Sequence, residues 1–487
     1  MRAVFDALGH HALTRPDAIA FRDDRAALTW AGLAGRVAGM ARRLEDAPRT
    51  VAIALDGGID YVTADLALAL TGRRQVPLPF FFSREQRAHI LNESRAGAVI
   101  AADPAPFAGL AVKVIAPGDA ASDLPEMPGM RDGAERVIYT SGSSGRPKGV
   151  VIGARQLGAS IAALARVVAA GPGERHLSVL PLAQLLEQIC GICLPVLSGA
   201  ECVMRRDATR AVLGGPVEGL SRAMAEVRPT TSVLAPGVLA RWCDLLAREG
   251  SRAPDSLRFV AVGGAPCAPG LIKAAQAAGI PAHEGYGLSE CCAVVAMNRP
   301  GDNMPGTVGR VLDGLDVRII DGEITVAGPT VMNGYLGGPP APARWHTGDL
   351  GRFEAGRLVI EGRKDALLIT PEGRNISPEW IEARVSADPR VALAALGLRD
   401  DDAALVLVVV PAGQVSAAEI AAHLEDLPAY ARPQSVIFAE PSEPGLIRPA
   451  GTPDRGVVAR LVNTRPAHPL NYPAGKADTG ISQRTLA

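Results

Sequence analysis

Four aliphatic hydroxyl side chains, three glycines and one lysine are concentrated between Tyr139 and Val150, in the sequence YTSGSSGRPKGV. Glycine permits sharp turns and close approach to a ligand, and successive backbone N–H groups in such a turn form a concave anion site. With the hydroxyl donors and the charge of Lys148, the segment predicts a polyphosphate site. It differs from the common G-x-x-x-x-G-K-[ST] loop, because Gly149 follows Lys148. A Ser/Gly-rich linker is the alternative, but strand-like residues 136–138 and helix-like residues 154–170 flank the segment and favour the phosphate site.

This segment resembles the phosphate-binding loop of the adenylate-forming superfamily, which comprises acyl- and aryl-CoA synthetases, peptide-synthetase adenylation domains and luciferases. Family-like segments follow in the family's order from Pro16 to about residue 455, and the second half is most similar to bacterial fatty-acyl-type AMP-binding ligases. The resemblance implies that Thr140 and Lys148 are catalytic. It implies further nucleotide-binding residues in the loop, namely Ser141, Gly142, Ser143, Ser144 and Gly145.

A second match is Gly285–Glu290, GYGLSE, which resembles the family's YGxTE element with serine in place of threonine. The resemblance implies that Tyr286 lies near adenine, with Gly285 and Gly287 on either side in the binding site. It also implies catalytic roles for Ser289 at the α-phosphate and Glu290 at Mg²⁺. A carboxylate suits Mg²⁺, which prefers oxygen ligands; the alternative interpretation is a turn with a solvated glutamate.

Two glycine-containing segments add to the resemblance. The first resembles the family's GGAP segment, whose backbone lines the adenine and acyl pocket, and consists of Gly263, Gly264, Ala265 and Pro266. Alone it is a weak signal, because Gly and Pro after a strand usually make a turn. Residues 322–336, GEITVAGPTVMNGYL, closely match another family segment, which we interpret as structural.

The last nucleotide-site matches come from WHTGD and GRKD. Asp349 resembles the aspartate of the family's RTGD motif, and its two oxygens could accept hydrogen bonds from both ribose hydroxyls. A helix cap or turn residue is the alternative. Arg363 matches a family residue that contacts ribose or phosphate, and Asp365 matches the hinge about which the family's C-terminal domain rotates.

Residues 180–187, LPLAQLLE, resemble the LPLAHxxE element of acyl-CoA synthetases, with Gln184 in place of histidine. Adenylation domains for α-amino acids place an aspartate just after that position, where this chain has Leu185. An ammonium group without its counter-ion in an apolar pocket costs several kcal/mol, so amino acids are disfavoured, and Glu187 is too far along to be assumed to compensate. We assign Gln184, Leu185 and Gly263 to the substrate pocket. The sequence weakly favours an aliphatic or unusual small acyl group as the substrate.

One expected residue is absent. The family has a catalytic lysine on a C-terminal loop, and the matching position here is Thr452. Losing a positioned cation beside developing charge is expensive, about 10²–10³-fold by analogy with the loss of one donor. Three explanations stay open: substitution by another cation (Arg448, Arg455 or Lys476), slow adenylation without it, or loss of adenylation with retained binding.

These motifs need elements to position them. Strand-like and helix-like runs alternate to about residue 300, which predicts an α/β architecture with largely parallel sheets. Short β-rich runs with glycines predict a β subdomain over residues 308–360. After residues 363–365, a helix opened by Ser377–Pro378 and a buried strand over residues 403–410 predict an α+β segment. We therefore predict an N-terminal adenylation core at 1–364, a small mobile C-terminal domain at 365–462 and a tail at 463–487.

The composition is that of a globular protein of 487 residues, with 48% hydrophobic and 21% charged residues and a net charge of -1. This charge gives no reason to expect nucleic acid or an anionic membrane as a partner. No apolar run approaches about 18 residues, so no membrane span is expected, and the N-terminus does not resemble a signal peptide. Seven scattered cysteines predict reduced thiols and a cytoplasmic location.

The sequence thus predicts an acid–thiol ligase that uses ATP and Mg²⁺. A small carboxylic acid becomes an acyl-AMP, and a thiol of CoA or of a carrier-protein phosphopantetheine then takes the acyl group. Any carrier protein would be a separate partner. The alternative is a non-catalytic or half-reaction homologue that binds nucleotide or acyl-adenylate, because of Thr452.

Overall fold

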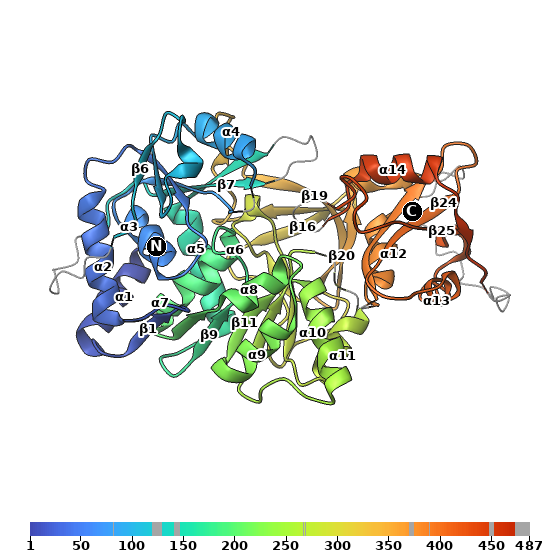
Figure 1. The fold of residues 1–487 in the computed structure, drawn as a ribbon, viewed down its shortest axis with the longest axis horizontal. Coiled ribbons are helices and arrows are strands. Elements are labelled where there is room, and N and C mark those ends of the chain that lie inside the picture. The colour runs from blue at the N-terminus through green and yellow to red at the C-terminus, as the bar shows by residue number, and fades with distance from the viewer. Residues whose placement is uncertain are drawn as a thin grey trace. The chain divides into compact units, whose positions relative to one another are not determined.

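Figure 1 shows the computed structural model of the chain. It describes residues 1–80, 82–118, 129–140, 147–265, 267, 269–369, 375–388, 390–447 and 452–472. The chain divides into two compact units, Met1–Ile360 and Glu361–Ala487, and each has its own hydrophobic cores. The predicted fold class is confirmed: the large first unit is α/β with a β-rich part, and the small second unit is α+β. A hinge at Asp365 remains a prediction.

The largest sheet of the first unit is parallel over most of its width. Strand-to-strand crossovers through helices produce this arrangement, because parallel neighbours cannot be joined by a tight turn. Only its margins are antiparallel among the described strands. The order is β15 (Arg310–Val311), β14 (Ala296–Met297), β13 (Ala282–Tyr286), β12 (Phe259–Val262), β11 (Thr231–Leu234), β9 (Arg175–Ser178), β10 (Glu201–Met204), β1 (Ile19–Arg22), β2 (Ala27–Thr29).

A second sheet carries the hydroxyl-rich segment. Its strands are parallel as far as β7 (Glu135–Thr140). Beyond β7, two further strands pair antiparallel. Lys148–Gly153 forms β8, a strand between the hydroxyl-rich segment and the following helix that was not predicted from the sequence. The order is β18 (Gly334–Tyr335), β8, β7 (Glu135–Thr140), β4 (Arg74–Pro77), β3 (Thr50–Ala54), β5 (Ala98–Ala101), β6 (Lys113–Ile115).

Helices fill the space between these sheets and cover their other faces. The main core joins one face of each sheet, through side chains such as Ile53 and Phe259, to the helices between them. Helix α5 shows why: its buried residues recur at helical spacing, from Leu157 through Ile161 to Leu164. The helices are α1 (Arg2–Thr14), α2 (Trp30–Arg43), α3 (Ile59–Leu70), α4 (Arg84–Ser94), η1 (Ala105–Phe107), α5 (Ala154–Val168), α6 (Leu185–Glu187), η2 (Gln188–Cys193), α7 (Leu194–Ser198), α8 (Arg206–Val212), α9 (Glu218–Val227), α10 (Pro236–Glu249), α11 (Pro269–Ala277) and η3 (Ser289–Cys291).

The predicted β subdomain is a small antiparallel sheet. Its strands are β16 (Asp316–Ile320), β17 (Glu323–Ala327), β19 (Arg344–Glu354) and β20 (Arg357–Arg363), in that order. Ile324, Val326 and Leu358 pack with Cys291 and Val295, so this sheet shares a core with the turn that follows β13. The sheet is thereby fixed next to the GYGLSE segment.

The second unit is a sheet with helices on both faces. Residues 405–410 are buried in β24, as predicted for this apolar run, and α12 begins at Ser377–Pro378 as expected. Of the predicted tail, residues 463–472 are described, and His468–Pro469 pairs with β25. The elements are η4 (Lys364–Ala366), β21 (Leu368–Ile369), β22 (Asn375–Ile376), α12 (Pro378–Val385), β23 (Val391–Leu398), β24 (Leu405–Pro411), α13 (Ala417–Ala422), η5 (Ala429–Ala431), β25 (Ser435–Phe438), α14 (Arg455–Thr464) and β26 (His468–Pro469).

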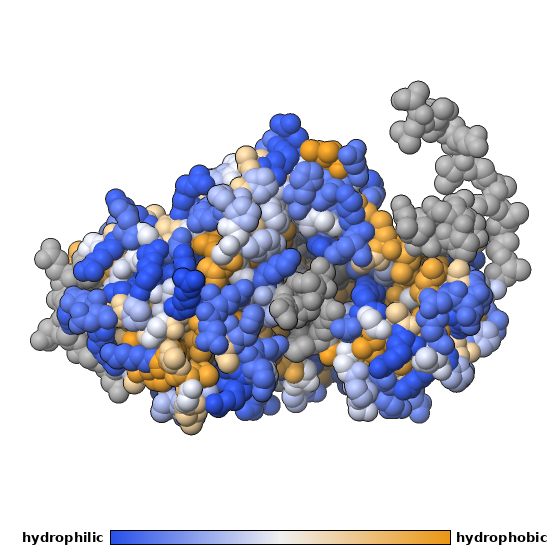
Figure 2. Space-filling model, turned by 90° about the horizontal axis from the view of Figure 1, so that it is seen from above, coloured by the Kyte–Doolittle hydropathy of each residue, from blue (hydrophilic) through white to orange (hydrophobic). Residues whose placement is uncertain are grey.

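Hydrophilic residues dominate the face seen in Figure 2, and hydrophobic ones lie between them in small groups. Among the helices that the structure describes, none combines the length and apolarity needed to cross a bilayer. Six of the seven cysteines are buried, and no disulfide forms within the described part of the chain. Burial raises the pKa of the Cys190 thiol, so this residue is packed as an unreactive apolar group.

Candidate active site

The two ends of the hydroxyl-rich loop lie opposite each other. Strands β7 and β8 pair antiparallel, with Thr140 directly across from Lys148. Thr140 is half-buried and Lys148 is exposed. The loop residues between them, Ser141, Gly142, Ser143, Ser144 and Gly145, lie outside the described residues. The strand pairing therefore fixes where the predicted phosphate loop begins and ends.

Lys148 and Glu290 meet the same tyrosine. The Lys148 ammonium lies 5.5 Å from the centroid of the Tyr335 ring, a distance typical of a cation–π contact. The Tyr335 hydroxyl donates to Oε1 of Glu290 at 2.9 Å. Lys148 and Glu290, two predicted catalytic residues that are 142 positions apart in sequence, are thus brought together. The contact of Tyr335 with both groups was not predicted, because residues 322–336 were interpreted as structural.

The turn that carries Ser289 and Glu290 is tightly built. A Cβ at Gly287 would lie 1.6 Å from the carbonyl oxygen of Ala293, so only glycine fits there. Cys292 and Ala293 both have positive φ, 56° and 82°, a conformation that non-glycine residues rarely adopt. The carbonyl of Glu290 accepts from the Met332 N–H at 2.8 Å. The backbone of this turn is therefore held from two sides.

Asp349 and Tyr286 are hydrogen-bonded. The Tyr286 hydroxyl donates to Oδ2 of Asp349 at 2.5 Å, and the Asp349 N–H donates to Oγ1 of Thr347 at 3.0 Å. Burial and then the adjacent Asp349 carboxylate raise the pKa of the Tyr286 phenol. Residues predicted to hold adenine and ribose therefore lie in direct contact, although they come from different sheets.

The Tyr335–Glu290 pair and the Tyr286–Asp349 pair adjoin each other. Tyr335 packs edge-on against Trp345 of β19, with ring centroids 5.9 Å apart, and Asp349 lies on the same strand. Tyr286, which donates to Asp349, packs in the same core cluster as Trp345 and as Cys291, the residue after Glu290. The structure thus gathers Lys148, Glu290 and Asp349 in one region of the first unit.

The GGAP segment lies beside the same turn. Gly263 approaches the backbone of Gly285 so closely that an added Cβ would be 3.1 Å from the Gly285 carbonyl oxygen. Gly264 has a φ of 85°, which favours glycine. Ala265 is exposed, and Pro266 lies outside the described residues. The described part of GGAP is therefore next to the predicted adenine site.

Glu284, directly before Gly285, escaped the sequence analysis. Its side chain is buried, and its Oε2 atom has no hydrogen-bond partner among the described residues. Desolvation raises the pKa of this carboxyl group to about 8. The only sequence signal was an acidic residue in a strand that is otherwise apolar or neutral, and nothing in its neighbours marked it as buried.

We expect Glu284→Gln to remove part of the pH dependence of stability. From the ordinary carboxyl pKa up to about 8, the unfolded chain has released this proton while the folded chain keeps it. Wild-type stability should therefore fall as pH rises through this window, by at most about 1.4 kcal/mol per pH unit from this group. Denaturant unfolding at pH 5, 6, 7 and 8 measures the slope, with the exposed Glu354→Gln as the matched control. Equal slopes in wild type and Glu284→Gln would contradict the assignment.

The predicted substrate-pocket segment includes a buried acid. Gln184 is exposed and Leu185 is buried, at the start of α6. Glu187 points to β9, where it accepts from the Ser178 hydroxyl at 2.5 Å and lies 3.6 Å from His176. The helix continues as a π-helix over Gln188–Cys193, a form that often occurs at functional sites. Glu187 is thus engaged with the large sheet.

Arg363 and Asp365 belong to the second unit and bind each other. The Arg363 guanidinium donates from Nε to Oδ1 of Asp365 at 3.0 Å and from Nη2 to Oδ2 at 3.2 Å. Hydrogen bonds from Arg363 lower the pKa of Asp365. The predicted ribose residue and the predicted hinge residue therefore form a bidentate pair.

The loop that lacks the family's lysine has no simple substitute in the described residues. Thr452 is exposed, whereas Arg455 donates to Oε2 of Glu382 at 3.0 Å and to Oε1 of Glu379 at 3.1 Å. Glu382 also accepts from the Leu396 N–H. Arg455 is therefore a structural cation that ties α14 to α12, while Arg448 and Lys476 lie outside the described residues.

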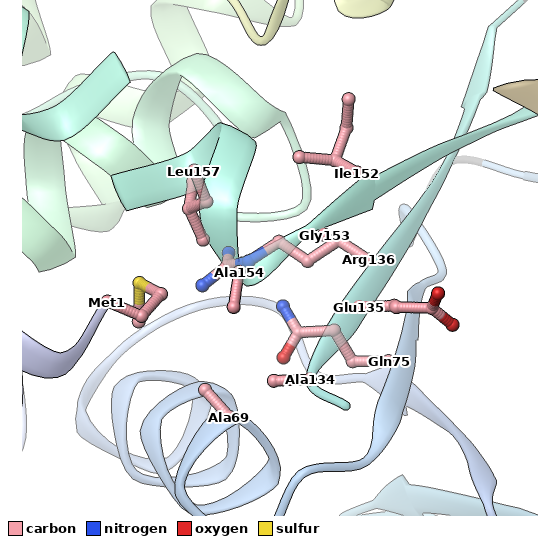
Figure 3. A pocket seen from close by; sticks show the side chains of 10 residues that line it. All are labelled: Met1, Ala69, Gln75, Ala134, Glu135, Arg136, Ile152, Gly153, Ala154 and Leu157. Atoms are coloured by element: carbon pink, nitrogen blue, oxygen red, sulfur yellow. The ribbon is translucent and has the colours of Figure 1, made fainter. Parts of the chain in front are cut away.

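A small pocket in the first unit lies apart from these residues. It lies beside Arg136, and Figure 3 shows the Arg136 guanidinium and the Gln75 amide directed into the same region. Arg136 pairs with buried Asp65 at 2.8 Å and also donates to Gln188. None of the described site residues lines it. Because its cation is already compensated, we interpret the pocket as part of the core.

Known proteins resemble this chain in sequence. The family model described as AMP-binding enzyme matches residues 8–336, more than half of the chain. An isonitrile lipopeptide synthase from Streptomyces coeruleorubidus is 30% identical over 90% of this chain, and the chain spans 32% of that protein's length. A 2-succinylbenzoate–CoA ligase from Bacillus cereus is 27% identical over 89% of this chain and 94% of its own length.

The fold is shared with solved structures. The o-succinylbenzoate coenzyme A synthetase (MenE) from Bacillus subtilis, in complex with AMP, matches with a TM-score of 0.78 and 24% identity. The match covers 92% of this chain and 97% of that one. At this identity the likeness concerns the fold, and it extends over both units.

Proposed function

Because the chain belongs to the AMP-binding enzyme family, we propose that it is an acid–thiol ligase acting in two steps. A carboxylate oxygen of the substrate bonds to the α-phosphorus of ATP, and the bond from that phosphorus to pyrophosphate breaks. A thiol sulfur then bonds to the acyl carbon, its proton is released, and AMP leaves. One observation carries the proposal: Lys148, Glu290 and Asp349, from three separate segments, lie in one region.

The nucleotide roles that we propose combine these contacts with the family resemblance. Thr140 and Lys148 would hold the phosphates at the two ends of the loop, and Ser289 would donate to the α-phosphate. Asp349 would accept from the ribose, while Tyr286 would lie at the adenine. The remaining nucleotide contacts would come from Ser141, Gly142, Ser143, Ser144, Gly145, Gly263, Gly264, Ala265, Pro266, Gly285, Gly287 and Arg363.

The metal assignment rests on Glu290. Mg²⁺ is usually held by one or two carboxylates together with substrate phosphates rather than by a full protein cage. Among the described residues no cluster of three His, Cys, Asp or Glu residues could hold a metal ion. A single half-buried carboxylate, bonded to the tyrosine that contacts Lys148, fits this mode. When bound, Mg²⁺ would neutralise phosphate charge. Glu290, oriented by its hydrogen bond from Tyr335, would hold it.

The substrate would be a small carboxylic acid without an α-ammonium group, since Leu185 stands where a counter-ion would be needed. The acceptor would be the thiol of CoA or of a carrier-protein phosphopantetheine. Relatives named as a CoA ligase and as a lipopeptide synthase support these two kinds of acceptor. We also propose that the second unit rotates about Asp365 between the two steps, a movement that often limits turnover.

Thr452 makes the first step the critical one to measure. Without a cation at that position, we expect ATP–pyrophosphate exchange to be slow, and Thr452→Lys to raise it by about tenfold or more, part of the factor attributed to one positioned donor. The assay uses a panel of aliphatic, aryl and amino acids, followed by transfer to CoA or to a phosphopantetheinyl carrier. Thr464→Lys, another exposed threonine of the second unit, is the matched control.

Two results would contradict the proposal. If no acid supports exchange in wild type or in Thr452→Lys while MgATP still binds, the chain is a binding protein. If Thr464→Lys raises exchange as much as Thr452→Lys, the added charge acts non-specifically and position 452 has no special role.

A further inference from the structure

We propose that Tyr335 is a positioning residue of the adenylation step, which holds Lys148 and Glu290 beside each other without letting them pair. The inference rests on the proposed function and adds a residue that the motifs did not assign. Its two contacts are on opposite parts of one side chain. The hydroxyl donates to Oε1 of Glu290 at 2.9 Å, and the ring lies 5.5 Å from the Lys148 ammonium.

The backbone around Tyr335 is hydrogen-bonded to the strand that begins with Lys148 and to Glu290 itself. Strand β18 pairs with β8, with Tyr335 opposite Val150, and the Leu336 N–H donates to the carbonyl of Gly149 at 2.7 Å. On the other side, the Met332 N–H donates to the carbonyl of Glu290 at 2.8 Å. A short segment thus bridges the strand that begins with Lys148 and the turn that carries Glu290.

The ring itself is fixed in orientation. Trp345 packs edge-on against it, with an interplanar angle of 73° and centroids 5.9 Å apart. Asn333, two residues earlier, accepts from the Gln156 amide at 2.6 Å, which anchors the segment to α5. Tyr335 is half-buried. Trp345 therefore sets the orientation of the ring, and the contact with α5 anchors the segment that carries it.

The physical need for such a residue follows from the charges. An ammonium and a carboxylate left together would form a direct ion pair, which would compete with phosphate for Lys148 and with a cation for Glu290. Among the described residues no ion pair joins the two. The aromatic face attracts the ammonium without neutralising it, and the hydroxyl occupies one carboxylate oxygen through a charge-assisted hydrogen bond.

The test compares Tyr335→Phe and Tyr335→Leu in ATP–pyrophosphate exchange over a range of Mg²⁺ and ATP concentrations. Tyr335→Phe keeps the ring and should raise the half-saturating Mg²⁺ concentration by about tenfold, the equivalent of about 1.4 kcal/mol, with little change in kcat at saturating Mg²⁺. Tyr335→Leu should also raise the KM for ATP, because Lys148 loses its cation–π contact with the aromatic ring. A merely structural tyrosine would lower stability and kcat without changing the Mg²⁺ requirement.

Tyr472 offers a matched control. Its hydroxyl donates to the Pro433 carbonyl at 2.9 Å and its ring lies 5.3 Å from the Arg432 guanidinium, so it makes the same two kinds of contact within the second unit. Tyr472→Phe should leave the Mg²⁺ requirement unchanged. Thermal unfolding of each variant shows whether it is folded.

The result that overturns the proposal is a Mg²⁺ requirement of Tyr335→Phe equal to that of wild type and Tyr472→Phe. A KM for ATP in Tyr335→Leu no higher than in Tyr335→Phe would overturn the role of the ring. If wild type shows no exchange with any acid, the ligase function fails separately. The Mg²⁺ dependence of ATP binding, measured by calorimetry in wild type and Tyr335→Phe, then decides the role of Tyr335.

Discussion

Glu290→Ala should lower Mg²⁺-dependent ATP–pyrophosphate exchange by about 10²–10³-fold, the range found when one group that stabilises developing charge is removed. The carboxylate is half-buried beside Lys148 and already oriented by Tyr335, so its loss removes a pre-positioned ligand. Exchange measured at rising Mg²⁺ concentration separates weaker metal binding, which excess Mg²⁺ restores in part, from a lost chemical contribution.

Glu354→Ala is the control for this variant. Glu354 is exposed and pairs with Arg352 at 2.8 Å on the surface of the first unit, where ion pairs contribute little. It should leave exchange near the wild-type rate. Unchanged exchange in Glu290→Ala would refute the metal assignment, whatever the control shows.

Asp349→Ala should reduce kcat/KM for ATP by at least about 100-fold. Two hydrogen bonds from ribose hydroxyls to a charged carboxylate are each worth about 1.5–3 kcal/mol, and about 1.4 kcal/mol corresponds to tenfold. Tyr286 would also lose the acceptor of its hydroxyl. Steady-state kinetics with ATP and with its 2′,3′-dideoxy analogue measure the effect, because the analogue lacks the bonded hydroxyls.

The analogue makes the result decisive. Wild type should discriminate strongly against dideoxy-ATP, and Asp349→Ala should discriminate little. If the variant keeps the wild-type preference for the ribose hydroxyls, Asp349 does not bind them. Asp313→Ala, which removes an exposed surface acid paired with Arg166, serves as the control.

Much of the architecture could be predicted from local patterns. The alternation of apolar strands and helices, the glycine-punctuated β region and the Ser377–Pro378 helix start are features of a few neighbouring residues, and each is where the pattern put it. Strand β8 was missed because Lys148–Gly153 contains two glycines and only three β-branched residues. Its pairing with β7 and β18, which is not visible locally, makes it a strand.

The candidate site could likewise be predicted only in part. Motif order suggested that Lys148, Glu290 and Asp349 share one site, but Tyr335 makes its two contacts only after β18 has paired with β8. Arg455 was a reasonable substitute cation in the sequence. Its ion pairs with Glu379 and Glu382, more than seventy positions earlier, exist only in the folded unit. Glu284 likewise became unusual only when the surrounding sheet excluded water from it.

The packing of Trp345 against Tyr335 has a practical consequence. The chain has four tryptophans, and in the first unit Trp30 and Trp242 are fully buried. Trp345 packs against the tyrosine that contacts both Lys148 and Glu290, so it is the indole of the first unit positioned to sense charge arriving at either residue. Its emission would serve as a built-in optical signal for ligand occupancy, and titrations could be followed without attaching a dye.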